Sequence, residues 1–212
     1  MMDIVEYGGW KSNVRLANGE IELLVTHDVG PRLIRFGFIG QRNMFQEIKD
    51  QMGKAGEKQW MIRGGHRFWI APEEKPKTYE LDNSPIEVLE IPNGVHTIQP
   101  TGSLSGFRRE LDITMSKKRN EVKIVHKMTN MGNRAATVSP WALTVMAIKG
   151  MAIIPQPKKI PHTKRLTHTH EWSLWGYTDL ADPRWSVGSR YIFFRQDPKK
   201  SPNKLGIQHK EG

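Results

Sequence analysis

Apolar and polar residues alternate along most of this chain, and the alternation predicts β-strands rather than helices. Residues 20–26 place Ile21, Leu23 and Val25 on one face. Residues 107–130 alternate in the same way on both sides of a turn, and His126 falls on the apolar face of the second run. We therefore expect His126 to be a half-buried cross-strand residue rather than a ligand.

Turn signals divide the chain into many short strands. Asn18-Gly19 predicts a hairpin between the residues near 14–16 and the strand that starts at Ile21, and Asn93-Gly94 predicts a second hairpin. Strands at such intervals predict an all-β protein, an antiparallel sandwich formed by residues 1–212 as one domain. The remaining expected elements are strands at 29–38, 86–91, 95–99, 141–148, 151–154 and 191–195, with 141–148 and 151–154 paired around Gly150, and loops at 49–58 and 155–170.

Composition narrows the classes of protein. The chain has 212 residues, 37% of them apolar, which suffices for a packed core. It has no Cys, which excludes disulfides, Cys-ligated zinc and thiol catalysis. The N-terminus lacks the apolar segment of a secretory signal, and the longest apolar run, 141–154, is too short for a bilayer. We expect a soluble, cytoplasmic protein with no membrane partner.

The formal net charge of +10 is unevenly distributed. Residues 1–106 carry 12 Lys and Arg against 14 Asp and Glu, whereas residues 107–212 carry 20 against 8. The basic residues of the second half are dispersed as short pairs, which favours a solvated surface and does not favour a nucleic-acid partner. A basic, non-enzymatic binding module for nucleic acid or another polyanion stays open as the alternative function.

The segment 60–73, WMIRGGHRFWIAPE, combines indoles, guanidinium groups, an imidazole and a carboxylate around two adjacent glycines. Aromatic rings stack on the C–H face of a sugar ring, and Arg, His and Glu bind its hydroxyl groups. A bend between two strands with Trp60 and Trp69 in the core is the structural alternative, and Gly64-Gly65 is also compatible with a phosphate nest. The candidate catalytic residues are His66 as proton carrier and Glu73 as acceptor of hydroxyl protons, and the candidate substrate-binding residues are Arg32, Arg63, Arg67, Trp69 and Trp141. For Arg32 a position in the cleft and one on a surface strand are equally compatible with the sequence.

Three histidines in the second half of the chain form a candidate metal site. His162, His168 and His170, with Glu171, could bind a transition metal if the segment were extended. The flanking residues are basic and loop-like, and nearby Lys and Arg oppose a cation. We therefore predict a solvated loop, and neither a metal nor another cofactor.

The order of these segments resembles the galactose mutarotase-like superfamily. The resemblance rests on GPRLIRFGFIG, RGGHRFWIAPE, TGSLSGFRRELDIT, HKMTNMGNRAATVSPWALTVM and LWGYTDLADPRW. Arg63-Gly64-Gly65 with Trp69 and Pro72 is similar to the hexose-6-phosphate mutarotase branch, and the whole sequence looks closest to a bacterial branch without an assigned activity. The resemblance implies an antiparallel β-supersandwich, related to aldose 1-epimerases, that binds a monosaccharide or sugar phosphate in a concave cleft.

Two departures from that pattern bear on catalysis. Trp141 stands where the resemblance places the catalytic histidine, and an indole cannot donate a proton reversibly near neutral pH. The glutamate base of the superfamily lies in C-terminal strands, and this sequence ends at Gly212. We therefore expect a domain that is incomplete at its C-terminus and that forms a homodimer through the open sheet edge. We expect it to bind a sugar, and the two departures argue against catalysis.

Overall fold

The computed structural model describes residues 2–209, and its regular elements are β-strands apart from two single 3-10 turns. The prediction of an all-β protein with antiparallel sheets is confirmed. Chain contacts divide it into two compact units, residues 1–147 and residues 148–212, which are described separately. Whether both belong to one domain stays a prediction. No helix within the described residues has the length and apolar character needed to cross a bilayer.

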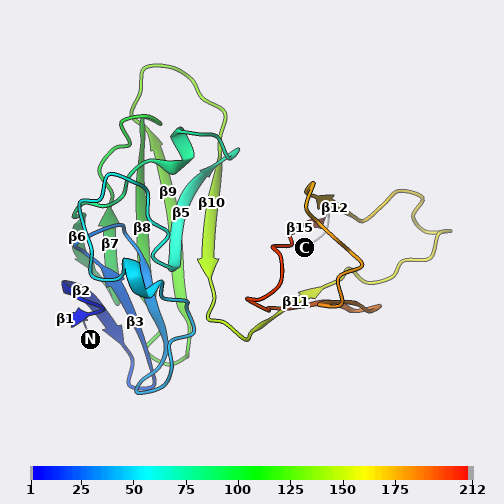
Figure 1. Ribbon diagram of the computed structural model, residues 1–212, viewed down its shortest axis with the longest axis horizontal. Coiled ribbons are helices and arrows are strands. Elements are labelled where there is room, and N and C mark those ends of the chain that lie inside the picture. The colour runs from blue at the N-terminus through cyan, green and yellow to red at the C-terminus, as the bar shows by residue number, and fades with distance from the viewer. Residues whose placement is uncertain (1, 210–212) are drawn as a thin grey trace. The chain divides into compact units, whose positions relative to one another are not determined.

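The first unit contains two antiparallel sheets (Figure 1). A six-stranded sheet has the order β1 (Met2–Tyr7), β2 (Trp10–Ala17), β3 (Ile21–Thr26), β4 (Leu33–Phe38), β5 (Gly65–Ala71) and β10 (Ser139–Val145). A four-stranded sheet has the order β6 (Glu87–Ile91), β7 (Gly94–Ile98), β8 (Phe107–Met115) and β9 (Val122–Asn130). The 3-10 turns are η1 (Lys49–Gln51) and η2 (Lys77–Tyr79).

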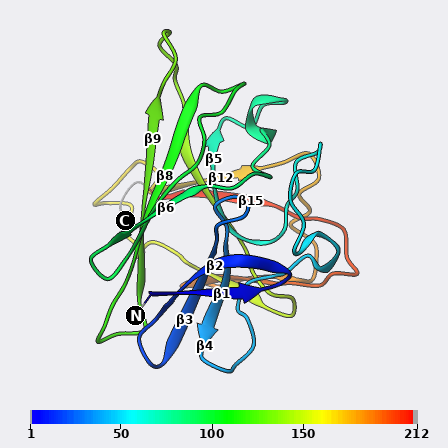
Figure 2. The ribbon, with the colours of Figure 1, turned by 90° about the vertical axis from the view of Figure 1, so that its left-hand side faces the viewer.

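The two sheets of this unit pack face to face around one apolar core. Leu23, Leu33 and Phe68 of the six-stranded sheet belong to the same buried cluster as Leu111 and Ile113 of the four-stranded sheet. Strands β1 and β2 run across the direction of β8 and β9 (Figure 2). We call the side of the six-stranded sheet that faces this core its inner face, and the opposite side its outer face.

Local turn chemistry was predicted well. The Asn18-Gly19 hairpin joins β2 to β3, and the Asn93-Gly94 turn joins β6 to β7. The Asn18 side chain accepts hydrogen bonds from the N–H groups of Glu20 (3.0 Å) and Ile21 (2.9 Å), which fixes the first turn. His126 is half-buried on β9, as its place in the alternation predicted.

Two predicted strand assignments are wrong. The strand expected at 29–38 begins only at Leu33, because residues 26–32 form a tight turn in which the Thr26 hydroxyl bonds the carbonyl of Val29 (2.6 Å) and the N–H of Arg32 (2.9 Å). The strands around Gly150 do not pair with each other. Strand β10 pairs with β5 in the first unit, and β11 (Met151–Pro155) pairs with β14 (Tyr191–Arg195) in the second. Distant hydrogen-bonding partners, and not the intervening glycine, determine both pairings.

The second unit consists of two small antiparallel sheets. One has the order β11, β14 and β13 (Trp185–Val187), and the other pairs β12 (His170–Leu174) with β15 (Leu205–His209). Within the described part of this unit, Ile192 is the single residue with a buried side chain. The apolar cores of the structure therefore lie in the first unit.

Candidate functional site

Strand β5 carries most of the predicted site residues, and its geometry separates them. It pairs with β10 along its length, with Trp69 opposite Trp141 and His66 opposite Thr144. Successive side chains of a strand point to opposite faces. His66 and Phe68 therefore lie on the inner face, where both rings contact His126, whereas Arg67 and Trp69 lie on the outer face. The structure does not bring His66 and Arg67 into one site.

The two glycines before this strand are required by close backbone packing. Gly64 and Gly65 both have positive φ, 102° and 64°. A Cβ atom at Gly64 would lie 1.9 Å from the carbonyl oxygen of Gln46, and one at Gly65 would lie 2.2 Å from that of Leu33. Any larger residue would push neighbouring strands apart. The Gly-Gly pair is thus explained by packing without a bound phosphate.

Arg63 anchors the loop that precedes the strand. Its side chain is fully buried, and Nη1 donates to the carbonyls of Gln51 (2.9 Å) and Lys54 (2.8 Å). Nη2 donates to the Glu57 carboxylate (2.7 Å) and to the Asn83 side-chain oxygen (3.0 Å). The guanidinium of Arg63 thus makes four hydrogen bonds to groups of the protein, and none of these partners is another predicted site residue.

His66 lies between the two sheets of the first unit. Its Nε2 is 2.9 Å from Nε2 of His126, and its Nδ1 is 2.8 Å from the Thr144 hydroxyl. Burial, followed by the neighbouring His126, Arg67 and Arg32, lowers the pKa of His66 to about 4. Burial also lowers the pKa of His126. Near neutral pH both imidazoles are therefore neutral. The Nε2–H of one ring donates a hydrogen bond to the Nε2 of the other.

This pair makes the fold sensitive to acid. The pKa of His66 is about 6.5 in the unfolded chain and about 4 in the folded protein. The contribution of His66 to folding stability is therefore complete above about pH 6.5 and decreases as the pH falls below that value. We expect the free energy of unfolding to drop by about 2 kcal/mol between pH 7.5 and pH 5 through this group. Urea unfolding of His66→Gln at both pH values should show a smaller drop. Phe68→Leu, which titrates nothing, should keep the full drop, and equal pH dependence in both variants would contradict the assignment.

Arg67 is the centre of an aromatic cluster on the outer face, which we define as Trp60, Arg67, Trp69, Tyr79 and Trp141. The Arg67 guanidinium lies over the ring of Trp69 (4.4 Å to its centroid) and over that of Trp60 (5.2 Å). Trp141 packs edge-on against Trp69, with ring centroids 5.6 Å apart. The Tyr79 ring contacts the indoles of Trp60 and Trp69. Arg67 and Trp69 are buried, whereas Trp60, Tyr79 and Trp141 are partly exposed.

The polar groups of this cluster are incompletely paired. Arg67 is only 7% exposed, and its Nε and Nη1 have no hydrogen-bond partner among the described residues, nor does the indole N–H of Trp60. Burial, and then Arg32, lowers the pKa of Arg67 to about 10, so the group remains a cation at neutral pH. The buried Arg32, Arg63 and Arg109 also have an unpaired Nε among the described residues, and Arg67 differs from them because its Nη1 is unpaired as well.

Charged residues surround the cluster. Arg32 is buried and forms an ion pair with Asp82 (2.5 Å), so it is not on a surface strand. The negative charge of Asp82 raises the pKa of Arg67, although the two groups form no ion pair. Glu73 is exposed and accepts a hydrogen bond from the Tyr79 hydroxyl, which associates it with the outer-face cluster and separates it from His66. The two members of the predicted catalytic pair therefore have different surroundings: His66 contacts His126 on the inner face, whereas Glu73 contacts Tyr79 of the outer-face cluster.

Sequence reasoning missed three participants, and little in the sequence could have revealed them. His126 is the partner of His66, although it lies 60 residues away on the other sheet. Tyr79 ends η2 and Asp82 follows it, in a segment that has no recognisable motif. Trp60 lies within the segment 60–73, and its ring contacts that of Trp69 at a tilt, with centroids 4.8 Å apart.

The histidines of the second unit lie apart from this cluster in the sequence and in their contacts. His168 bonds the carboxylate of Glu171 (2.7 Å), and His170 faces His209 across the β12–β15 pair. Across residues 2–209, no group of three His, Cys, Asp or Glu side chains has the geometry to hold a metal ion.

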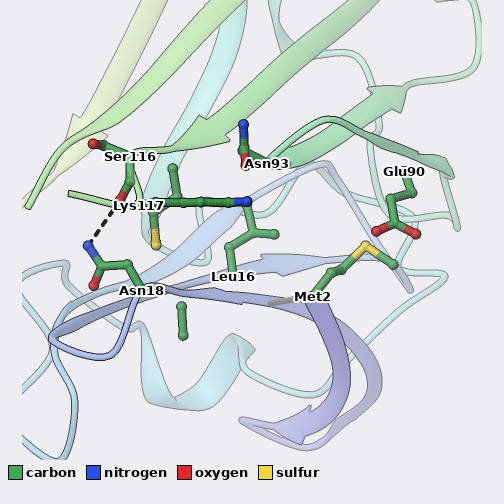
Figure 3. Close-up of a pocket in the computed structure, with 10 residues that line it drawn as sticks. Met2, Leu16, Asn18, Glu90, Asn93, Ser116 and Lys117 are labelled. Carbon is green, nitrogen blue, oxygen red and sulfur yellow. Dashed lines mark hydrogen bonds between the residues drawn. The ribbon is translucent and has the colours of Figure 1, made fainter. Parts of the chain in front are cut away.

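A separate hollow of about 200 Å³ lies at one end of the sandwich (Figure 3). Met2, Leu16 and Met115 line it with apolar atoms, and Asn18 closes one side by donating to the carbonyl of Ser116 (3.1 Å). None of the predicted site residues lines this hollow.

Comparisons with protein-family models, with curated proteins and with solved structures found no match to this chain.

Proposed function

We propose that the outer-face cluster binds a monosaccharide or a sugar phosphate, with Arg67 as the central binding residue. The observation that carries the proposal is the buried Arg67 guanidinium, stacked on two indoles, with Nε and Nη1 unpaired. Sugar rings require an aromatic face for their C–H groups and fixed donors for their oxygens. The partly exposed indoles of Trp60 and Trp141 supply the first requirement, and Arg67 supplies the second.

The charge of the cluster favours an anionic sugar. Arg32 is neutralised by Asp82 at 2.5 Å, whereas no carboxylate lies within ion-pair distance of Arg67 among the described residues. A cation stacked on aromatic rings in a largely dry position interacts more strongly with a phosphate than it would in water. Glu73, exposed beside Tyr79, would accept protons from sugar hydroxyl groups.

The proposal is for binding and not for epimerisation. A mutarotase needs an acid and a base on the two sides of one sugar ring. His66 lies on the inner face with its two ring nitrogens next to Thr144 and His126, and its pKa of about 4 leaves it without an exchangeable imidazolium proton at neutral pH. The resemblance to the galactose mutarotase-like superfamily supports the sugar as ligand.

Calorimetric titration of the full chain with glucose, galactose and their 6-phosphates tests the proposal. We expect saturable binding of at least one of the four, and tighter binding of the phosphate than of the parent sugar because Arg67 is uncompensated. Polarimetry with the same sugars should show no acceleration of anomer exchange. The absence of saturable heat with all four sugars would contradict the proposed function.

A further inference from the structure

A basic groove lies in the second unit. Two adjoining hollows of about 580 Å³ and 540 Å³ share the residues 156–159 and Ser189 as a common wall. Their lining includes no Asp or Glu, and the cationic side chains around them are Lys158, Lys159, Arg165 and Arg190, with His168 and His170 at one end. One basic pair of the sequence, Lys158-Lys159, thus lines both hollows, together with Arg165 in the first and Arg190 in the second.

The groove has a defined backbone frame. Strands β11 and β14 pair up to Pro155 and Tyr191, and the N–H of Gln156 then donates to the carbonyl of Arg190 (2.8 Å). The Gln156 side-chain amide also donates to the carbonyl of Gly188. These bonds fix the segment before Lys158 against the turn that carries Arg190, so the cations of both segments are held close to the same hollow.

Three of the cations that line the groove are not compensated by a carboxylate. Residues 148–209 contain eleven Lys and Arg but four Asp and Glu. Glu171 bonds His168 at one end of the groove, Asp182 pairs with Arg184 (2.7 Å), and Asp179 and Asp197 accept from backbone N–H groups in turns. Among the described residues, Lys158, Lys159 and Arg190 have no ion-pair partner. An uncompensated cationic groove attracts polyanions.

We propose that this groove binds single-stranded nucleic acid without sequence preference. Lys158, Lys159 and Arg190 would contact successive phosphates, which suits a polymer because the two hollows share part of their lining. Tyr191 lines the second hollow together with these cations, and the residue is 44% exposed. An exposed aromatic ring beside a basic groove provides a stacking surface for a base, which distinguishes a nucleic acid from other polyanions.

Fluorescence anisotropy of the full chain with a labelled oligothymidine tests the proposal. Three phosphate contacts predict a slope of about −2 for log affinity against log salt, hence a loss of roughly 20-fold between 50 and 200 mM NaCl. The triple variant Lys158→Gln, Lys159→Gln, Arg190→Gln should lose at least tenfold in affinity at low salt and most of this slope. The matched control, Lys117→Gln, Lys118→Gln, Lys123→Gln, removes the same charge from the first unit and should lose less than twofold.

Tyr191→Leu separates a nucleic acid from a general polyanion. We expect it to weaken oligothymidine binding by about tenfold, consistent with the loss of one stacked base, and to leave binding of inorganic polyphosphate unchanged. Equal losses in the groove triple and the control triple would overturn the proposal. It would also be overturned by oligothymidine binding that is insensitive to Tyr191→Leu, or by no binding at low salt. None of these results depends on whether sugars bind the first unit.

Discussion

Replacing Arg63 with methionine is expected to lower the free energy of unfolding by about 3–5 kcal/mol, the range for breaking a buried, hydrogen-bonded ion pair. The substitution retains most of the side-chain volume but leaves the carboxylate of Glu57, the amide oxygen of Asn83 and two loop carbonyls without their donor. Unfolding by urea, followed by tryptophan fluorescence in the absence of any sugar, measures the change.

Arg119→Met provides the control for this prediction. Arg119 lies in the exposed turn between β8 and β9, where its ion pair with Glu121 is solvated. Exposed pairs contribute at most about 1 kcal/mol, so the control should remain close to the parent protein. If Arg63→Met were no less stable than Arg119→Met, Arg63 would not anchor the loop, and its sequence-based assignment to ligand binding would regain support.

Replacing Arg67 with methionine is expected to weaken binding of a hexose 6-phosphate about 100-fold, which corresponds to about 2.7 kcal/mol. The loss combines a cation and two N–H donors that have no partner inside the protein. Methionine retains an apolar contact with Trp60 and Trp69, so the cluster should stay packed. Calorimetric titration gives the affinity, and near-ultraviolet circular dichroism reports whether the indoles keep their arrangement.

Two further variants make this result interpretable. Arg67→Lys keeps the charge but loses the planar fork, so it should recover part of the affinity for the phosphate and little of that for the parent sugar. Arg119→Met removes one charge of the same kind at a distant exposed position and should bind normally. Unchanged affinity in Arg67→Met would mean that the guanidinium is a structural cation–π contact alone.

The parts of the fold that could be predicted are those determined by neighbouring residues. Asn18-Gly19 and Asn93-Gly94 specify their turns through backbone conformations that few other residues adopt, and both hairpins are present. The alternation at 107–130 also specifies which side chains face the core. By contrast, the partners of β10 and β11 lie some 70 and 40 residues away, and no local pattern identifies them.

The site was predicted less well, because neighbouring positions in a strand do not share a face. A motif that reads Arg-Gly-Gly-His-Arg suggests one constellation, yet β5 directs His66 toward β9 and Arg67 toward the indoles. The residues 65–70 are buried on both faces, so the usual contrast between apolar and polar positions is lacking in this strand. The sequence therefore indicated the right strand, and the division of its side chains between two faces required the structure.

The central claim, that a sugar binds at the Arg67 cluster, is tested most directly by the indole N–H signals of the seven tryptophans in a ¹⁵N correlation spectrum. Addition of the hexose 6-phosphate should shift the signals of Trp60, Trp69 and Trp141 and leave those of Trp10, Trp172, Trp175 and Trp185 in place. Shifts confined to the second group, or no shift at saturating sugar, would contradict the account.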